Sequence, residues 1–307
     1  MALAISDDKS WEGADFICQT FNCLTIIRDI STRSKPLLRD PDHIMFASPI
    51  KSIAWLSFFT AILAAWVWLY MMAMGMDLDL IGRPGPMGEA MRRMDPRMDM
   101  YMPMAEFWPL FAMWAVMMAA MMLPTMVPTL QVYEDLITSA DGTRAGWWGV
   151  LLGYSVAWVA FAALITGVQL ALLFGGVIDM LGIFTSTWMV GALLLVVGVF
   201  QFTRAKEICH GVCHSPMGYF LGHWSPGFAG GTRMGLGLGA FCVGCCWGFM
   251  ALGFVGGMMS LLWMGLATFF MVLEKVPELG QRVVRPLGGA LVAAGLAVLA
   301  VPLVKGG

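Results

Sequence analysis

The chain has 307 residues, of which 59% are hydrophobic and only 12% are charged, and its formal net charge is −2. Soluble domains are typically about half apolar and a quarter charged, so this composition predicts an integral membrane protein. Because basic residues are not in excess, the sequence carries no electrostatic signature of nucleic-acid binding, and we expect no nucleic-acid partner.

The first 49 residues form a polar arm ahead of the first apolar run. Its stretch ADFICQTFNCLTIIRDI, residues 14–30, can form an amphipathic helix that lies on the membrane surface. Cys18 and Cys23 belong to this stretch, but their spacing of five gives them no common helix face. We therefore interpret these two cysteines as structural.

Apolar runs follow, each close to the roughly 20 residues that a helix needs to cross a bilayer. They cover residues 50–72, 107–132, 147–174, 183–202, 234–256, 258–276 and 286–304. The predicted fold is therefore all-α, a polytopic transmembrane helical bundle of about seven spans over residues 50–304. Pro124 and Pro128 predict a kink in the second span. The fifth and sixth runs meet at Gly256 and Gly257, either as a helical hairpin or as one kinked helix.

Lysine and arginine predict the orientation, because cytoplasmic loops carry an excess of them. With seven spans, thirteen lie on the side of the N-terminal arm and five on the other side. We expect a multi-pass protein of the bacterial inner membrane with a cytoplasmic N-terminus. Merging the fifth and sixth spans would reverse the C-terminal tail.

The predicted outer loop, residues 73–106, is rich in methionine. Residues 71–104 hold eleven methionines, several interleaved with Asp, Arg and Pro. A polar loop gains little packing from methionine, whereas the soft thioether selects Cu(I) over hard cations. Copper capture is one interpretation, and an adaptable apolar cap or partner-binding surface is the other.

The second span continues this pattern into the membrane. Met113, Met117 and Met121 are spaced four apart and form one stripe, and Met118 and Met122 form a second. Packing alone would explain such stripes, but their position next to the methionine-rich loop also predicts a ladder of copper ligands.

The fifth span contains the stretch FCVGCCWGFM. At helical spacing Cys242, Cys245 and Cys246 share one face near the middle of the span, and Met250 follows. Glycines at 235, 237, 239, 244 and 248 would let another helix approach closely. Buried structural cysteines, a thiol–disulfide pair and a metal site are the three interpretations. Two or three thiolates with a thioether suit Cu(I), whereas structural Zn sites take four ligands.

The segment 203–233, predicted on the inner side, holds two further pairs of ligands. Cys209 and Cys213 are four residues apart, as are His210 and His214, which suits a metal site on a helix. The run is one residue too long for the Cys-x-x-Cys-His signature of haem attachment, so we expect no haem. The lone His43 and His223 are interpreted as structural.

Glu274 closes the sixth span. If the fifth and sixth spans form a hairpin, Glu274 returns to within a turn of Cys242 in depth. It could then be a ligand, a counter-charge or a proton acceptor for a thiol. The alternative is that Glu274 and Lys275 mark the membrane interface.

The chain resembles a bacterial family of predicted metal-binding integral membrane proteins, some of which are regarded as copper chaperones of tyrosinase-type polyphenol oxidases. The matching stretches are MWAVMMAAMMLPT, QFTRAKEICHGVCHSP, GAFCVGCCWGFM, GGMMSLLWM and LEK, within residues 107–276. The resemblance implies copper handling. It implies as candidate ligands Met117, Met118, Met121, Met122, Cys209, Cys213, Cys242, Cys245, Cys246 and Glu274. His210 and His214 are not among the fixed positions of that family.

We therefore expect a non-enzymatic Cu(I) chaperone that supplies a periplasmic or membrane cuproenzyme through Met and Cys ligands. The sequence shows no nucleotide-binding signature, so an ATP-driven pump is not expected. The alternatives are a membrane thiol–disulfide oxidoreductase and an accessory or scaffold subunit of a membrane complex.

Overall fold

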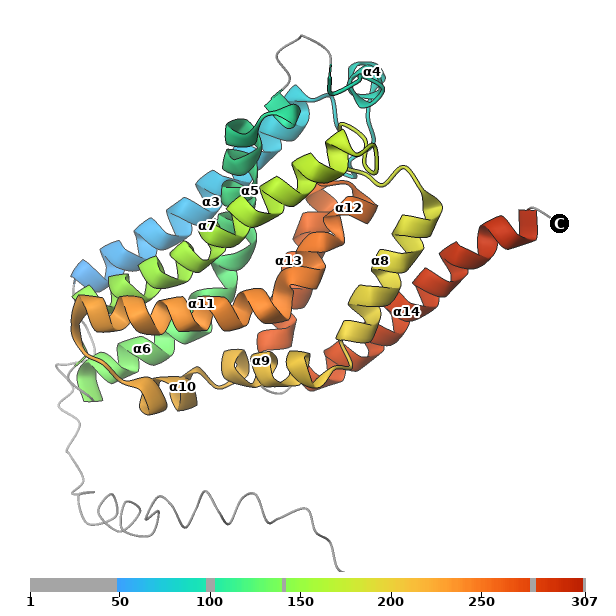
Figure 1. The fold of residues 1–307 in the computed structure, drawn as a ribbon. Coiled ribbons are helices and arrows are strands. Elements are labelled where there is room, and N and C mark those ends of the chain that lie inside the picture. The colour runs from blue at the N-terminus through green and yellow to red at the C-terminus, as the bar shows by residue number, and fades with distance from the viewer. Residues whose placement is uncertain (1–48, 98–102, 140–141, 277–279, 306–307) are drawn as a thin grey trace, which may run out of the picture. The chain divides into compact units, whose positions relative to one another are not determined.

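The computed structural model describes residues 49–97, 103–139, 142–276 and 280–305 (Figure 1). It divides into two compact units, Met1–Leu56 and Ser57–Gly307, and the packing described below lies within the second unit. The proposed interfacial helix of the arm, with Cys18, Cys23 and His43, lies outside the described residues.

The secondary-structure elements within these ranges are helical, which confirms the all-α prediction for the described part of the chain. The longer helices are α3 (Pro49–Gly75), α5 (Phe107–Met122), α6 (Val127–Ser139), α7 (Arg144–Phe174), α8 (Thr187–Phe200), α9 (Arg204–His214), α11 (Gly227–Ala251), α13 (Leu261–Lys275) and α14 (Gly280–Lys305). The short ones are α4 (Pro86–Arg92), η2 (Pro103–Ala105), η3 (Pro124–Met126), α10 (Pro216–His223) and α12 (Gly253–Gly256).

Five segments are long and apolar enough to cross a membrane, where seven were predicted. They are Lys51–Gly75, Phe107–Ile137, Arg144–Phe174, Gly227–Gly256 and Arg282–Val301. A sixth is obtained if α8 and the first part of α9, which meet at 58°, count as one broken span. Helix α13 has 15 residues. At about 1.5 Å per residue it is shorter than the hydrocarbon core of a bilayer, so seven spans are not confirmed.

The second membrane-length segment is interrupted where its prolines predicted a kink. Helix α5 ends at Met122, a 3-10 turn covers Pro124–Met126, and α6 continues from Val127. The hydroxyl of Thr125 donates to the carbonyl of Met122 at 2.8 Å. The side chain thus satisfies one carbonyl near the break, as expected for a proline-interrupted membrane helix.

Helices α7 and α11 pack along two rows of glycine. On α11 the row is Gly231, Gly235 and Gly239, spaced four apart, and each faces the backbone or a small side chain of α7. A Cβ added at Gly235 would overlap the carbonyl of Val150. Glycine therefore permits the close backbone approach that the sequence predicted for this helix.

The loops after α3 and α7 have the same internal structure. In each, the Oδ1 of an aspartate, Asp79 or Asp179, accepts hydrogen bonds from the backbone amides two and four residues later. The glycine three residues after each aspartate, Gly82 or Gly182, has a positive φ of 84° or 76°. A larger residue would be strained there. The two turns are built from the same local chemistry although they are far apart in the chain.

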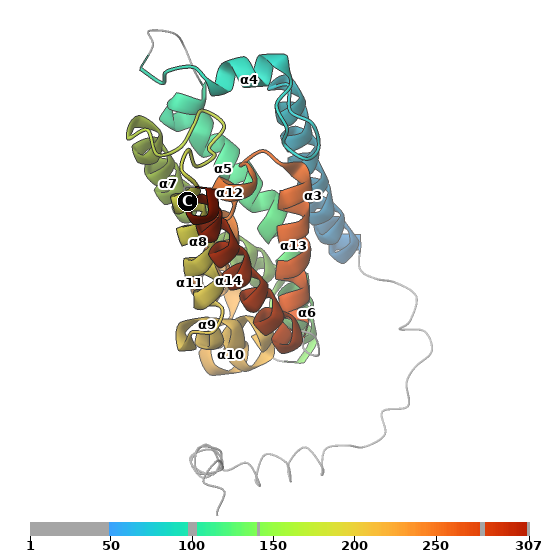
Figure 2. The ribbon, with the colours of Figure 1, turned by 90° about the vertical axis from the view of Figure 1, so that its right-hand side faces the viewer.

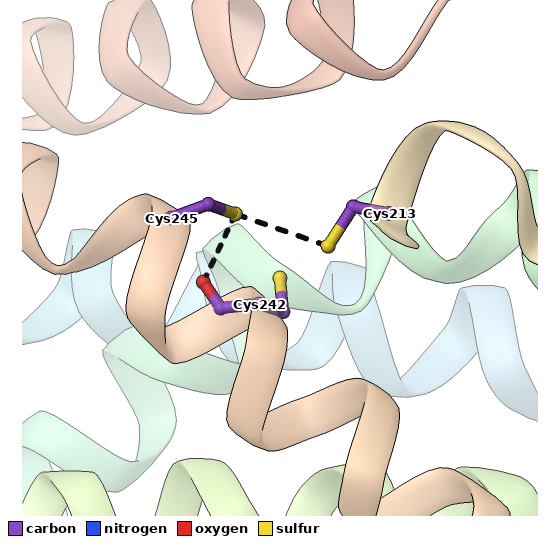
Figure 3. Close-up of side chains that lie close together, drawn as sticks. All are labelled: Cys213, Cys242 and Cys245. Atoms are coloured by element: carbon purple, nitrogen blue, oxygen red, sulfur yellow. Dashed lines mark hydrogen bonds between the residues drawn. The ribbon is translucent and has the colours of Figure 1, made fainter. Parts of the chain in front are cut away.

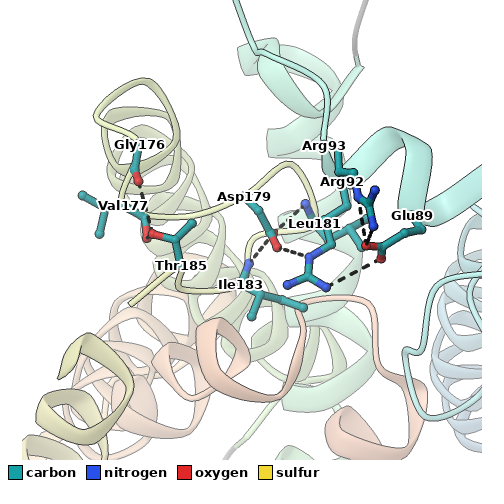
Figure 4. A network of polar contacts seen from close by, with 9 residues as sticks. All are labelled: Glu89, Arg92, Arg93, Gly176, Val177, Asp179, Leu181, Ile183 and Thr185. Carbon is teal, nitrogen blue, oxygen red and sulfur yellow. Dashed lines mark hydrogen bonds and ion pairs between the residues drawn. The ribbon is translucent and has the colours of Figure 1, made fainter. Parts of the chain in front are cut away.

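Helix α4 is joined to the second of these loops by an ion pair (Figure 4). The Nε of Arg92 lies 2.7 Å from Oδ2 of Asp179, and Glu89 contacts both Arg92 and Arg93. The hydrogen bond that Arg92 donates to Asp179 raises the pKa of Arg92 above its ordinary value. The methionine-rich loop is thereby anchored to the loop that follows α7.

The chain reverses between α11 and α13. Helix α12 ends before Gly257, whose φ is +94°, and the hydroxyl of Ser260 caps the first turn of α13. Near this turn the amide of Leu262 bonds to the carbonyl of Leu80, whereas at the other end of α13 Lys275 contacts Cys242 on α11. Of the two alternatives, the hairpin therefore describes the path of the chain between α11 and α13.

Figure 2 shows α4 at one end of the helices and α9 and α10 at the other.

Candidate metal centre

Three cysteines from two helices bring their sulfur atoms together (Figure 3). The Sγ atoms of Cys213 on α9 and of Cys242 and Cys245 on α11 all lie within 4.8 Å of one another. Cys242 and Cys245 are buried and Cys213 is partly buried. The Sγ of Cys213 is 3.9 Å from that of Cys245, which also points at the carbonyl of Cys242 at 3.2 Å. Cys213, which precedes Cys242 by 29 residues, thus joins the two cysteines of α11 in one thiol cluster, which we call the thiol triad.

Glycine and a helix cap position the third thiol. Helix α9 begins after Thr203, whose hydroxyl accepts from the amide of Lys206 at 3.3 Å. A Cβ added at Gly244 of α11 would lie 3.0 Å from the Sγ of Cys209. The missing side chain at Gly244 lets α9 lie against α11. One helical turn after Cys209, Cys213 then reaches the triad.

The remaining members of the predicted face of α11 also lie inside. Cys246 is buried, and its Sγ is 3.3 Å from that of Cys245. Met250, two turns beyond Cys242, is buried as well. The cysteine-rich face of α11 thus points into the protein, where Cys213 meets it.

A lysine and a tyrosine contact the triad at Cys242. The Nζ of Lys275 lies 3.4 Å from the Sγ of Cys242 and donates to the hydroxyl of Thr125 at 2.8 Å. The phenol oxygen of Tyr154 lies 3.1 Å from the same sulfur and 3.2 Å from the Thr125 hydroxyl. Polar groups from α7, η3 and α13 thus surround this thiol.

A second lysine contacts the triad at Cys245. The Nζ of Lys206 donates to the carbonyl of Cys245 at 2.9 Å and to Oε2 of Glu274 at 2.8 Å. Lys206 and Glu274 are only 1% and 2% exposed. Desolvation of a buried ion pair is costly, and the cost is offset only when the two charged groups are well hydrogen-bonded. The bonds of this pair connect α9, α11 and α13. Glu274 therefore lies beside the thiol cluster, as predicted, and its observed partner is Lys206.

Both predicted methionine stripes of α5 are buried. Their members Met113, Met117, Met118, Met121 and Met122 are each at most 3% exposed. Met118 and Met122 line a cavity of about 60 Å³ together with Tyr154 and Trp158 of α7. The cavity therefore lies between the second methionine stripe and the tyrosine that contacts Cys242.

The methionine-rich loop is only partly described. Met71, Met74 and Met87 are exposed, whereas Met76 and Met104 are buried. Met98, Met100 and Met102 lie outside the described residues. The loop therefore presents some of its methionines on the surface and uses others for packing.

The structure describes only part of the histidine set. The backbone of α9 includes His210 and His214, but their side chains lie outside the described part of the structure. The ring of His223 stacks on Tyr219 in α10, with centroids 4.6 Å apart. The structure therefore assigns His223 a packing contact.

Sequence reasoning missed four polar residues of the centre: Thr125, Tyr154, Lys206 and Lys275. From the sequence, Lys206 and Lys275 indicated only the orientation in the membrane or the membrane interface. The available signal was the sequence Glu274-Lys275 at the end of an apolar run, because ionisable residues within such runs are usually functional. Thr125 and Tyr154 are too ordinary in sequence to be singled out.

Comparison with known proteins identifies a family. The model of a family described as PpoB2, copper chaperone, matches residues 111–298, which is more than half of the chain. The match includes the second-span methionines and every cysteine of the cluster. No curated protein and no solved structure matches the chain.

Proposed function

Because the chain belongs to the PpoB2 copper chaperone family, we propose that it binds Cu(I) at the thiol triad and delivers it to a cuproenzyme. Copper is the cargo in this proposal, and no bond of a substrate is made or broken by the protein. The suspected relationship to copper chaperones, inferred from the sequence motifs, is confirmed by the family match.

The observation that carries the proposal is the convergence of Cys213, Cys242 and Cys245. Their sulfur atoms lie within 4.8 Å of one another in the protein interior. Soft thiolate ligands favour Cu(I), which accepts few ligands, whereas structural zinc sites are usually closed by four. Three sulfur atoms in one pocket thus suit a monovalent soft cation.

The proposed route to this centre runs along sulfur. The exposed methionines of residues 71–87 would capture Cu(I), and the buried stripes of α5 would carry it to the level of Met122. The hydroxyls of Thr125 and Tyr154 approach the carbonyl of Met122 at 2.8 and 3.5 Å. Tyr154 also contacts Cys242, so the end of the stripe is next to the triad. Exchange of ligands between neighbouring sulfur atoms would move the ion without releasing it.

We propose that the five membrane-length segments cross the bacterial inner membrane, with the N-terminus in the cytoplasm. The methionine-rich loop would then face the periplasm, and α9 and α10 would face the cytoplasm because the shorter α8 would return the chain through the bilayer. The auxiliary ligands around the triad would be Met250, Cys209, Cys246, His210 and His214.

Elemental analysis of the purified full-length chain tests this function. The wild type should carry about one copper ion at the triad, and Cys213→Ser, Cys242→Ser and Cys245→Ser combined should reduce copper to background. Cys18→Ser with Cys23→Ser is the matched control, because both residues precede the matched region, and it should retain copper.

Two results would replace the proposal. A copper-free wild type with a reducible disulfide in the cluster would favour a thiol–disulfide oxidoreductase. A deletion strain with normal copper tolerance and normal cuproenzyme activity, but without a co-purifying complex, would favour a scaffold subunit.

A further inference from the structure

The two lysines beside the thiol triad differ in how their charge is balanced. Lys206 forms an ion pair with Glu274, with 2.8 Å between Nζ and Oε2. Lys275 donates to the hydroxyl and the carbonyl of Thr125, at 2.8 and 3.3 Å, and contacts Cys242 at 3.4 Å. These partners of Lys275 are neutral groups and a thiol.

The charge of Lys275 is held in place by three elements. Its stem ends α13, its two oxygen partners belong to the 3-10 turn at Thr125, and its ammonium lies 5.9 Å from the ring centroid of Tyr154 on α7. The aromatic face adds a favourable contact with a cation. These contacts hold the ammonium beside the sulfur of Cys242.

Adding the charges around the triad gives a simple balance. Among the side chains that the structure describes around the triad, Lys206 and Glu274 cancel, and Lys275 leaves one positive charge. A Cu(I) ion bound by two thiolates carries one negative charge, so the loaded centre with Lys275 is neutral. Charges in a site of low dielectric interact strongly, and a centre without net charge is the least costly to bury.

We propose that Lys275 is the counter-ion of the copper–thiolate complex, so that the triad binds Cu(I) through two thiolates in a neutral centre. This inference rests on the proposed copper function and adds a residue to it. Lys275 acts through Cys242 and not as a metal ligand, so it is a positioning and charge-balancing residue.

Substitutions that separate charge from hydrogen bonding test the proposal. Lys275→Arg keeps the charge, Lys275→Gln keeps a donor for Thr125 but removes the charge, and Lys275→Met removes both. The affinity of the purified full-length chain for Cu(I) is measured without oxygen, in competition with a chromophoric Cu(I) chelator. Arg should stay near the wild type, whereas Gln and Met should each lose affinity roughly 10-fold or more.

A second-site rescue distinguishes a counter-ion from a structural lysine. In Lys275→Gln combined with Glu274→Gln, the charge of Lys206 is no longer cancelled, and the net charge of the centre returns to its original value. This double variant should regain most of the affinity that Lys275→Gln loses. A lysine needed only for packing would not be replaced in this way.

The outcomes separate the two proposals. The counter-ion role would be overturned if Lys275→Gln had wild-type affinity, or if the double variant bound Cu(I) no more tightly than Lys275→Gln. The proposed function would still stand in either case, provided that the wild type binds copper. Loss of affinity in Lys275→Met alone would assign Lys275 a hydrogen-bonding role and also overturn the proposal. A wild type that binds no Cu(I) would overturn both.

Discussion

The phenol oxygen of Tyr154 lies 3.1 Å from the Sγ of Cys242. The two residues come from α7 and α11, the pair of helices that pack through glycine, so the contact depends on the close approach of their backbones. A hydroxyl at this distance can donate to a thiolate, and Tyr154 also lines the cavity at Met122.

Removing this hydroxyl should weaken the centre without unfolding the protein. A hydrogen bond to a charged group contributes about 1.5–3 kcal/mol, so Tyr154→Phe should lower the affinity for Cu(I) by roughly 10-fold or more. The measurement is a chelator competition on the purified chain. Tyr219→Phe is the control, because the Tyr219 hydroxyl bonds to the carbonyl of Met234 instead. Equal affinities in both variants would argue against a role for Tyr154.

The two cysteines of α9 should differ in their effect on copper binding. Cys213 belongs to the triad, whereas the Sγ of Cys209 faces the backbone position of Gly244. Cys213→Ser removes one of the three sulfur atoms and should therefore clearly lower bound copper, whereas Cys209→Ser should retain most of it. Elemental analysis at equal protein concentration gives the comparison. Greater loss in Cys209→Ser would place the ion nearer the start of α9 than we propose.

The sequence alone predicted much of this centre, because helical periodicity is regular. Spacing put Cys242, Cys245 and Cys246 on one face of a helix, and the structure buries that face. The hairpin count brought Glu274 to the depth of the thiols, and its neighbour Lys275 contacts Cys242. The glycine pattern predicted a close helix partner, which is α7 for Gly235 and Gly239.

The partners across helices could not be predicted in this way. Nothing in the spacing of α9 indicates that Cys213, and not Cys209, reaches the triad, since that depends on how two helices cross. The ion pair of Lys206 with Glu274 joins residues 68 apart. Seven spans are not confirmed, because the apolar runs 183–202 and 258–276 include loop residues and the helices within them, α8 and α13, are shorter than the runs.

The buried pair of Lys206 and Glu274 should make a strongly non-additive contribution to stability. Removing one partner leaves the other charge buried alone, which typically costs about 3–5 kcal/mol. Glu274→Leu and Lys206→Met should each lower the midpoint of thermal unfolding of the purified chain. The double variant should be clearly more stable than the sum of the two effects allows. Additive losses would show that the pair contributes little beyond its separate side chains.

Glycine at the contact of α7 with α11 should be essential, and α7 supplies its own control. A Cβ at Gly153 would overlap the carbonyl oxygen of Thr232, whereas a Cβ at Gly167 would meet no atom within 4 Å. Gly153→Ala should therefore destabilise the chain by about 1–3 kcal/mol through overpacking. Gly167→Ala should be neutral or stabilising by up to about 1 kcal/mol, because alanine favours helix. Thermal unfolding in detergent measures both variants.

Since Gly153 is next to Tyr154, Gly153→Ala should also reduce bound copper. If the two variants had equal stability and equal copper content, the proposed packing of the centre would be contradicted.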